Sequence, residues 1–329
     1  MVLVYNILEM LLKKIHLALR RNKLFYYTKG YFLKMIPAKF FERKLSKKLL
    51  NRSQSDVAYV SERVDYYNKL DQIIATPPNF LSLKHASTLN VPTSYVIDSY
   101  EYLRYFSKEL KANFTFGDVV TTSEVPTIQK ARPINDFNRN AVLLNLDKKR
   151  HFFFIQDAKK FSEKQNLLFG RGVITQSHRI KFMEMYYNHP LCNLGQVNNE
   201  GGSKIWFKPK VSIIAHLDYK FILSLEGNDV ATNLKWIMSS NSIAVMTKPK
   251  YESWFMEGRL IPDFHYILIK DDYSDLVEKL KYYIANTEKS ETIVRNANQY
   301  VQQFFNLDQE DLIAFLVLEK YFYYTSQVI

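Results

Sequence analysis

Cysteine is almost absent from this chain, since Cys192 is the single cysteine among 329 residues. One thiol can form neither a disulfide framework nor a zinc cage built from cysteines, and its isolation fits a reducing compartment. Glycine is also scarce, with 9 residues. The signatures G-x-x-x-x-G-K-[ST], G-x-G-x-x-G, G-x-S-x-G and H-E-x-x-H do not occur. The seven histidines are scattered along the chain, so the sequence predicts no metal site.

Long apolar runs are missing as well. No segment reaches the roughly 18 uninterrupted apolar residues that a membrane-spanning helix needs. The opening run MVLVYNILEMLL is interrupted by Glu9 and is followed by basic residues. A secretory signal has its basic residues before the apolar stretch and a cleavage site of small residues after it. We therefore expect a cytoplasmic protein, either free or bound to a membrane surface.

Positive charge is abundant but unevenly distributed. The net charge is +12, and residues 1–52 contain 13 Lys and Arg but only 2 Glu. The remaining residues contain 32 basic and 31 acidic side chains, so the body of the protein is close to neutral. A uniformly basic nucleic-acid-binding protein would not show this division. We expect no nucleic-acid partner.

The first 52 residues combine basic and apolar side chains. Five aliphatic residues recur there at helical spacing: Leu8, Leu11, Leu12, Ile15 and Leu19. Aromatic residues, including Phe25, Tyr31 and Phe40, lie beside the charges. This combination is typical of a helix that lies on an anionic membrane surface. A helical subdomain with a solvated basic face, or contact with nucleic acid, are the alternatives.

The rest of the chain alternates between helical and strand patterns. Before residue 160, helical patterns cover 64–70 and 99–110, and strand patterns cover 114–116, 119–122, 141–146 and 151–155. After residue 160, strand patterns cover 211–215, 221–225, 243–246 and 265–269. Helical patterns end the chain at 273–285, 293–305 and 311–324. This alternation predicts an α/β protein with a parallel sheet covered by helices.

Seven of the nine glycines lie between residues 170 and 258, which marks this region as the ligand domain. Within it, Leu168–Arg179 has the pattern of a strand end, a glycine turn and a helix start. The N-terminus of a helix attracts phosphate, and Arg171 and Arg179 could add bidentate contacts. The alternative is an ordinary turn with surface arginines.

Two later segments also combine turns with polar residues. Phe221–Ile237 has the pattern of a buried strand, a Glu-Gly-Asn-Asp loop and a helix that starts near Asp229, with Lys235 in its second turn. Ligands of open α/β sheets bind at the carboxyl ends of strands, where this loop is expected. Lys248–Ile267 is a long loop rich in aromatic and charged residues, and such loops are often functional. The alternatives are a capped helix and a packed connection.

Together these segments resemble glycosyltransferase family 90, above all its bacterial lipopolysaccharide core branch. The likeness covers about residues 100–305. It is carried by four stretches: Lys130 with Arg132–Ile134, Arg171–Gly172, Glu226–Trp236, and Pro262 with His265–Ile267. The resemblance implies a GT-B fold with two Rossmann-like domains that face a cleft. It assigns residues 53–160 to the acceptor side, 161–305 to the donor, and 306–329 to a C-terminal helix that packs on the first domain.

The resemblance also implies where the donor binds. Eukaryotic members hold the donor diphosphate with the string Arg-Gly-Ser-Arg-Thr-Ser-x-x-Arg. This chain follows that string at Arg171, Gly172, Thr175 and Arg179, and Ser177 lies one position after the second serine of the string. It departs from the string at Val173 and Ile174. A second family arginine corresponds to Asn233, and Lys235 could replace it. The donor-binding residues expected on this basis are Arg171, Gly172, Thr175, Ser177, Arg179, Glu226, Gly227, Asn228, Asp229, Asn233 and Lys235.

The family reaction implies an inverting displacement in which a carboxylate of the first domain acts as base. Asp118 is the preferred candidate, because it follows a strand and a glycine turn, and Glu124 is the other. The resemblance implies UDP-glucose or UDP-galactose as the donor and a lipopolysaccharide core sugar as the acceptor, with no cofactor or metal required. It also implies an acceptor on the inner leaflet of the cytoplasmic membrane, to which the basic arm would bring the enzyme. Transfer to capsule or another glycan, or a non-catalytic membrane-surface or nucleic-acid-binding role, are the alternatives.

Overall fold

The computed structural model describes residues 22–50, 56–86, 88 and 93–328. The periodic apolar residues 8–19 of the basic arm therefore lie outside the described part. The chain divides into two compact units. Unit 1 comprises residues 1–153 together with 307–329, and unit 2 comprises residues 154–306. Each unit has its own sheet and its own core, and each is described separately.

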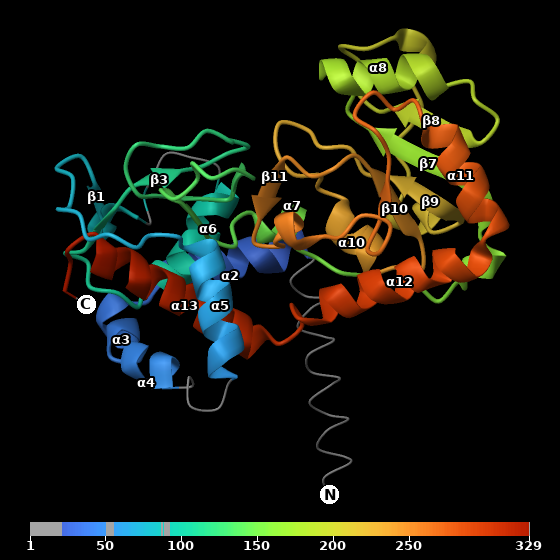
Figure 1. The fold of residues 1–329 in the computed structure, drawn as a ribbon. Helices are drawn as coiled ribbons and strands as arrows, with labels where there is room; N and C mark the ends of the chain where they lie inside the picture. Colours follow the sequence, from blue (N-terminus) through green and yellow to red (C-terminus); the bar gives the residue numbers. More distant parts are fainter. Residues whose placement is uncertain (1–21, 51–55, 87, 89–92, 329) are drawn as a thin grey trace, which may run out of the picture. The chain divides into compact units, whose positions relative to one another are not determined.

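Unit 2 is built around a sheet of five parallel strands, coloured green to orange in Figure 1. In spatial order the strands are β12 (Ile267–Leu268), β10 (Ile243–Met246), β9 (Tyr219–Leu223), β7 (Gln165–Gly172) and β8 (Cys192–Gln196). All four residues of β10 are buried, as expected of a strand covered on both faces. The chain adds β8 on one side of β7 and β9 on the other. The order of the strands therefore reverses between β7 and β9.

Helices cover this sheet. They are α8 (Ser177–Tyr186), α9 (Ile213–His216), α10 (Leu234–Met238), α11 (Leu276–Ala285) and α12 (Thr287–Gln302). In α11, the buried residues Leu276, Leu280 and Tyr283 recur at the spacing of one helical face and join the core of the sheet. Short 3-10 helices lie at Phe161–Glu163, Lys204–Trp206 and Glu257–Arg259. The sequence-based prediction of a parallel sheet covered by helices is confirmed for this unit.

One strand predicted for this unit is wrong. Residues 211–215 were expected to be extended, but Ile213–His216 forms α9. Ser212 precedes this helix in an extended conformation, and its hydroxyl accepts a hydrogen bond from the backbone N–H of Ala215 (3.3 Å). A serine that caps the N-terminus in this way stabilises a helical turn that the apolar run Val211–Ala215 does not reveal.

Unit 1 contains a smaller parallel sheet, in which β4 (Thr127–Gln129) lies between β3 (Phe114–Thr115) and β6 (Ala141–Leu143). A separate antiparallel pair joins β1 (Leu81–Ser82) to β2 (Lys111–Ala112). The other short elements of unit 1 are α7 (Lys148–His151), β5 (Ala131–Pro133) and a 3-10 helix at Leu83–His85. The short strand β11 (Tyr251–Ser253) belongs to unit 2. Strands predicted at 119–122 and 151–155 do not form, because no described strand pairs with them.

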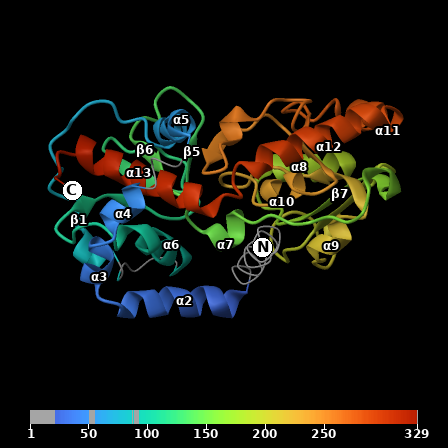
Figure 2. The ribbon, with the colours of Figure 1, turned by 90° about the horizontal axis from the view of Figure 1, so that it is seen from below.

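Helix α13 (Leu307–Tyr324), shown in dark red in Figure 2, packs against α4 (Leu45–Leu50) and α5 (Val57–Tyr67) in unit 1. Helix α2 (Lys23–Met35) packs on α6 (Thr93–Leu103), and α3 (Ala38–Glu42) precedes α4. Every residue from Leu312 to Leu318 in α13 is buried, so this helix forms the centre of the core. The buried Arg63 of α5 pairs with Glu310 of α13. Asn68 donates to the carbonyl oxygen of Val317 (3.0 Å), which fixes the end of α5 on α13.

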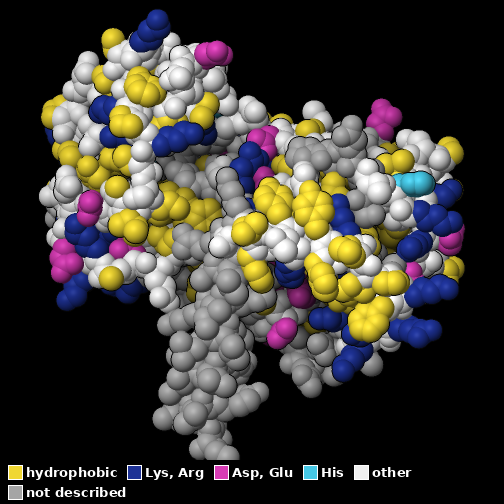
Figure 3. Space-filling view, turned by 180° about the vertical axis from the view of Figure 1, so that it is seen from behind, with side chains coloured by type: hydrophobic (Ala, Val, Ile, Leu, Met, Phe, Trp, Pro, Cys, Tyr) yellow, Lys and Arg dark blue, Asp and Glu magenta, His cyan; other side chains and the backbone are white. Residues whose placement is uncertain are grey.

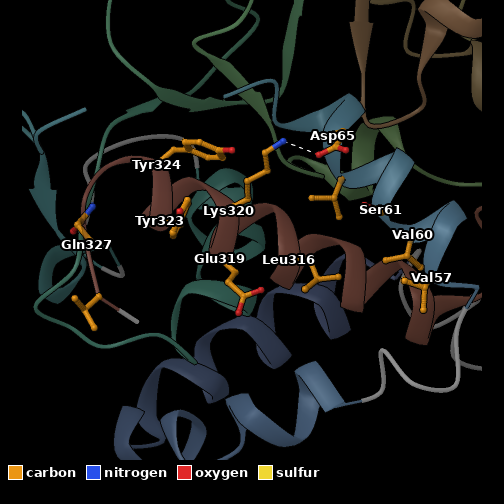
Figure 4. Close-up of a pocket in the computed structure, with 12 residues that line it drawn as sticks. Val57, Val60, Ser61, Asp65, Leu316, Glu319, Lys320, Tyr323, Tyr324 and Gln327 are labelled. Atoms are coloured by element: carbon orange, nitrogen blue, oxygen red, sulfur yellow. Dashed lines mark hydrogen bonds and ion pairs between the residues drawn. The ribbon is translucent and has the colours of Figure 1, made fainter. Parts of the chain in front are cut away.

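A groove of about 640 Å³ lies on the surface of unit 1 where α5 and α13 meet. Figure 4 shows Val57 and Val60 on one wall and Leu316 on the other, with the ion pair of Lys320 and Asp65 (2.7 Å) across it. Of the helices in the described ranges, none combines the length and the apolar character required to cross a membrane.

Candidate functional site

A pocket of about 260 Å³ opens in unit 2 at the carboxyl ends of β7 and β9. These are the two strands between which the strand order reverses, and ligands of doubly wound sheets bind at this switch point. The walls are mostly apolar, with two arginines and an asparagine among them. The lining residues are Gly170, Arg171, Gly172, Val173, Ile174, Arg179, Phe182, Met183, Leu194, Gly195, Leu223, Leu225, Thr232 and Asn233.

Arg179, in the first turn of α8, joins the two loops that form the pocket. Its Nε donates to the carbonyl oxygen of Glu226 (2.9 Å), and its Nη2 donates to that of Leu225 (2.7 Å). Its Nη1 donates to the carbonyl oxygen of Val173 (2.9 Å). Three backbone bonds fix the guanidinium at the rim of the pocket, beside the N-terminus of α8. This N-terminus carries unpaired N–H groups and a partial positive charge.

Arg171 lies at the end of β7 and is held by β8. Its Nη1 donates to the carbonyl oxygens of Gly170 and Asn193 (both 2.8 Å), and its Nη2 donates to the Asn193 side chain (2.9 Å). The guanidinium also stacks over the ring of Phe169, 4.3 Å from the ring centroid. Burial lowers the pKa of both Arg171 and Arg179, but a guanidinium remains cationic at neutral pH. The pocket therefore holds two positive charges.

The Glu-Gly-Asn-Asp loop follows β9 beside this pocket. Asn233, which lines the pocket, donates to the carbonyl oxygen of Leu223 (2.9 Å) and accepts from the hydroxyl of Ser224 (3.0 Å). Asn228 is exposed and accepts from the side chain of Gln176 (3.1 Å). Asp229 is buried, and its carbonyl oxygen accepts from the backbone N–H of Gly227 (3.0 Å).

Glu226 carries a carboxyl group with a perturbed pKa. Burial raises the pKa to about 7, although the backbone N–H groups of Lys250 (3.0 Å) and Tyr251 (3.2 Å) donate to Oε1 and oppose the shift. The group therefore titrates near neutral pH in the folded protein. In the unfolded chain it titrates near its ordinary value of 4.5.

This pKa shift predicts how Glu226→Gln affects stability. Between pH 4.5 and about 7 the folded state binds more protons at this site than the unfolded state, so the group's contribution to stability falls as the pH rises. A glutamine at this position does not titrate. The Tm of Glu226→Gln should match the parent near pH 4.5 and exceed it increasingly up to pH 8. Thermal melts at half-unit pH steps measure this. A constant Tm difference at every pH would contradict the raised pKa.

Lys235 was expected among the donor-binding residues, but it forms a buried ion pair with Glu257. It is 1% exposed, and its Nζ is 2.5 Å from Oε1 of Glu257, which is itself buried. Glu257 also accepts hydrogen bonds from the backbone N–H and the hydroxyl of Ser253. The helix was expected to start near Asp229, but α10 begins at Leu234, so the preceding residues form a loop. Lys235 is not among the residues that line the pocket.

The remaining residues of the predicted diphosphate string lie around the start of α8. Thr175 and Ser177 are exposed, and Ser177 is the first residue of that helix. A Cβ built at Gly172 would meet no atom within 4 Å, so this position faces open space in the pocket. The structure thus brings Arg171, Gly172, Arg179 and Asn233 together in one pocket. It places Lys235 in a separate buried ion pair.

The candidate base Asp118 lies in unit 1. Its Oδ1 is 2.5 Å from both Nζ of Lys130 and Nη2 of Arg150, and these two cations lower its pKa against the opposing effect of burial. The preceding Gly117 has a φ of +115°, in the region that favours glycine, as the predicted glycine turn requires. The other candidate, Glu124, is exposed, and its carbonyl oxygen accepts from Asn140 (2.6 Å).

Sequence reasoning missed the cations around Asp118 and the apolar walls of the pocket. Lys130 is 2% exposed and also contacts Nε2 of His151 (3.2 Å). The sequence analysis singled out Lys130 as part of the Lys-x-Arg-Pro-Ile stretch but assigned it no function. Gly195 lines the pocket and packs on Lys208, where a built Cβ would approach the Lys208 Cβ to 2.7 Å. The cluster of glycines in the sequence, to which Gly195 belongs, was the feature that could have indicated this wall of the pocket.

Comparison with known proteins shows which proteins this chain resembles. Residues 149–324 match the model of glycosyl transferase family 90. The chain is 40% identical over 304 residues to the O-glucosyltransferase LpsA of Dichelobacter nodosus, covering 92% of this chain and 95% of that protein. Protein O-glucosyltransferase 3 of Rattus norvegicus is 28% identical over 104 residues, or 31% of this chain and 20% of that protein.

A third relative extends the likeness. Protein O-glucosyltransferase 1 of Rattus norvegicus is 26% identical over 98 residues, which are 30% of this chain and 25% of that protein. The resemblance inferred from the sequence is confirmed by the family match and by the long alignment to the bacterial enzyme. The chain is a glycosyltransferase and belongs to glycosyl transferase family 90.

Proposed function

We propose that this enzyme transfers a hexose from a UDP-sugar to a sugar of the lipopolysaccharide core, with inversion and without a metal ion or other cofactor. The candidate donors are UDP-glucose and UDP-galactose. The likeness to an O-glucosyltransferase over nearly the whole chain favours glucose. The reaction would take place at the cytoplasmic face of the inner membrane, where the lipid-anchored acceptor is available.

One observation carries the proposal: the pocket at the switch point of unit 2 combines two arginines with a helix N-terminus. A nucleotide sugar carries its negative charge on the diphosphate in the middle of the molecule, between the nucleoside and the sugar. Arg171, Arg179 and the first turn of α8 supply positive charge at one place in the pocket, and Thr175 and Ser177 supply hydroxyl groups nearby. The apolar walls leave room for the less polar parts of the donor.

In the proposed reaction, the Asp118 carboxylate accepts the proton of the acceptor hydroxyl. The oxygen of that hydroxyl forms a bond to the anomeric carbon, while the bond from that carbon to the diphosphate oxygen breaks and UDP leaves with the electron pair. Lys130 and Arg150 hold Asp118 ionised at neutral pH, because they lower its pKa. Arg171 and Arg179 stabilise the charge that develops on the leaving diphosphate, which is the role a metal ion has in other transferases.

This assignment gives each unit one task in a GT-B enzyme. Unit 2 would bind the donor, and unit 1, to which the C-terminal helix α13 contributes, would supply the base and bind the acceptor. We test the donor first, by calorimetric titration of the purified enzyme with UDP in the absence of metal, with ADP and GDP as controls. Selective binding of UDP supports the proposal. Equal binding of the three nucleotides, or none, would refute the donor assignment.

Gly172→Leu tests the position of the donor. A Cβ at residue 172 would meet no protein atom within 4 Å, and this residue lines the pocket. We therefore expect UDP affinity to fall at least tenfold, or about 1.4 kcal/mol, with little change in Tm. Gly170→Leu is the matched contrast. A Cβ at residue 170 would lie 3.1 Å from Leu194, so this variant should lose stability. Unchanged UDP affinity in a folded Gly172→Leu variant would place the donor elsewhere.

A further inference from the structure

Helix α2 has two faces of opposite character. Its inner face packs on α6 of the same unit: the hydroxyl of Tyr26 donates to Asp98 (2.9 Å), and Nζ of Lys29 pairs with Glu101 (3.2 Å). Gly30 is buried so closely that a Cβ there would lie 2.6 Å from Ile97. These contacts fix the rotation of α2 about its axis. Its opposite face must therefore point away from unit 1.

That opposite face is apolar and exposed. Leu24, Tyr31 and Met35 follow one another at helical spacing and are 76%, 54% and 81% exposed, and Phe32 beside them is 62% exposed. Phe40 of α3 continues the surface and is 54% exposed, while its neighbour Phe41 is buried against Tyr105. We call the surface formed by Leu24, Phe25, Tyr31, Phe32, Met35 and Phe40 the α2–α3 face. Large apolar side chains gathered on one exposed surface indicate an interaction site.

Cations surround the α2–α3 face. Residues 22–50 contain eight Lys and Arg, and Glu42 is their single acidic residue. Nζ of Lys44 lies 3.9 Å from the ring centroid of Phe40, and Nζ of Lys34 lies 5.7 Å from that of Tyr31. Figure 3 shows the side of the molecule that carries α2, where yellow side chains lie among dark blue ones. The exposed cations of α3, α4 and the turn between them are Lys39, Arg43, Lys44 and Lys47.

We propose that the α2–α3 face is a docking surface for an anionic lipid bilayer. Aromatic rings, Leu24 and Met35 suit the boundary between headgroups and acyl chains, and the flanking lysines suit anionic headgroups. A second copy of the chain is a poorer fit, because two such faces would bring like charges together. The α2–α3 face would hold unit 1 against the membrane. This inference concerns membrane binding and does not depend on the identity of the sugar donor.

Flotation with lipid vesicles tests the proposal on the full-length protein. We expect binding to vesicles of phosphatidylglycerol and phosphatidylethanolamine, little binding to phosphatidylcholine vesicles, and weaker binding at high salt. The double variants Phe32→Ser/Met35→Ser and Lys39→Glu/Lys44→Glu should each bind at least about tenfold more weakly. The control Ile205→Ser/Ile214→Ser removes side chains of unit 2 that are 70% and 78% exposed, and it should bind like the parent.

Three outcomes would overturn the proposal. The first is parental binding by both variants of the α2–α3 face. The second is equal loss in the Ile205→Ser/Ile214→Ser control. The third is a dimer, seen by light scattering, that these variants dissociate while the parent binds no vesicles. Calorimetry with UDP on the same samples separates this result from the proposed function. Loss of vesicle binding with normal UDP binding would contradict only the docking surface. Loss of UDP binding with normal vesicle binding would contradict only the donor assignment.

Discussion

Replacing Asp118 with asparagine is expected to lower the rate of sugar transfer by about two to four orders of magnitude, the range that general-base catalysis contributes. Asparagine has the shape of aspartate but cannot accept a proton at neutral pH. Its side-chain oxygen can still accept from Lys130 and Arg150, which contact Oδ1 of Asp118 in the parent. UDP affinity should stay unchanged, because Asp118 belongs to unit 1 and the pocket with the arginines belongs to unit 2.

Single-turnover transfer from UDP-glucose or UDP-galactose to a soluble core fragment measures the chemical step. Glu124→Gln is the matched control, since it removes the exposed alternative base by an equally conservative change. We expect this control to transfer at close to the parental rate. The assignment is wrong if Asp118→Asn keeps that rate while Glu124→Gln loses it. A shared loss with weakened UDP binding would point instead to damage of the fold, which thermal melts would reveal.

The sequence predicted the core of unit 2 better than the periphery of unit 1. The strand at 243–246 was correctly bounded, because it is a short run of four apolar residues, all buried, that follows a helix and ends at a polar loop. Residues 119–122 and 151–155 looked equally extended but lack partner strands in the described ranges. A segment becomes a strand only if another strand pairs with it, and the tertiary structure determines whether such a partner is present.

The candidate site was predicted in part for a similar reason. The glycine cluster led to the pocket, because glycines at 170, 172 and 195 leave the space that the pocket occupies or let the backbone approach closely. The partners of the charged residues could not be predicted. Lys130 is 12 residues from Asp118 in the chain, and Lys235 is 22 residues from Glu257. Only the folded structure shows that one lysine supports the candidate base and the other lies in a buried ion pair.

The buried pair of Lys235 and Glu257 predicts a large effect on stability. Lys235→Met preserves the length of the stem but leaves the Glu257 carboxylate, 2% exposed, without its cation. Breaking a buried pair from one side costs about 3–5 kcal/mol. For a unit of this size we expect the Tm to fall by about 10 °C. Ser253 still donates to Glu257 in the variant, but neutral donors do not replace a cation. Calorimetric or fluorescence melts measure the change.

The double variant Lys235→Met/Glu257→Gln decides whether this lysine also binds the donor. Glutamine removes the buried negative charge and can still accept from Ser253, so the double variant should recover at least half of the lost stability. If Lys235 acts only through Glu257, UDP affinity returns with stability. If Lys235 contacts the diphosphate, the double variant is stable yet binds UDP about tenfold or more weakly, as expected for one lost charged contact. The 2.5 Å contact with Glu257, and the absence of Lys235 from the pocket lining, favour the first result.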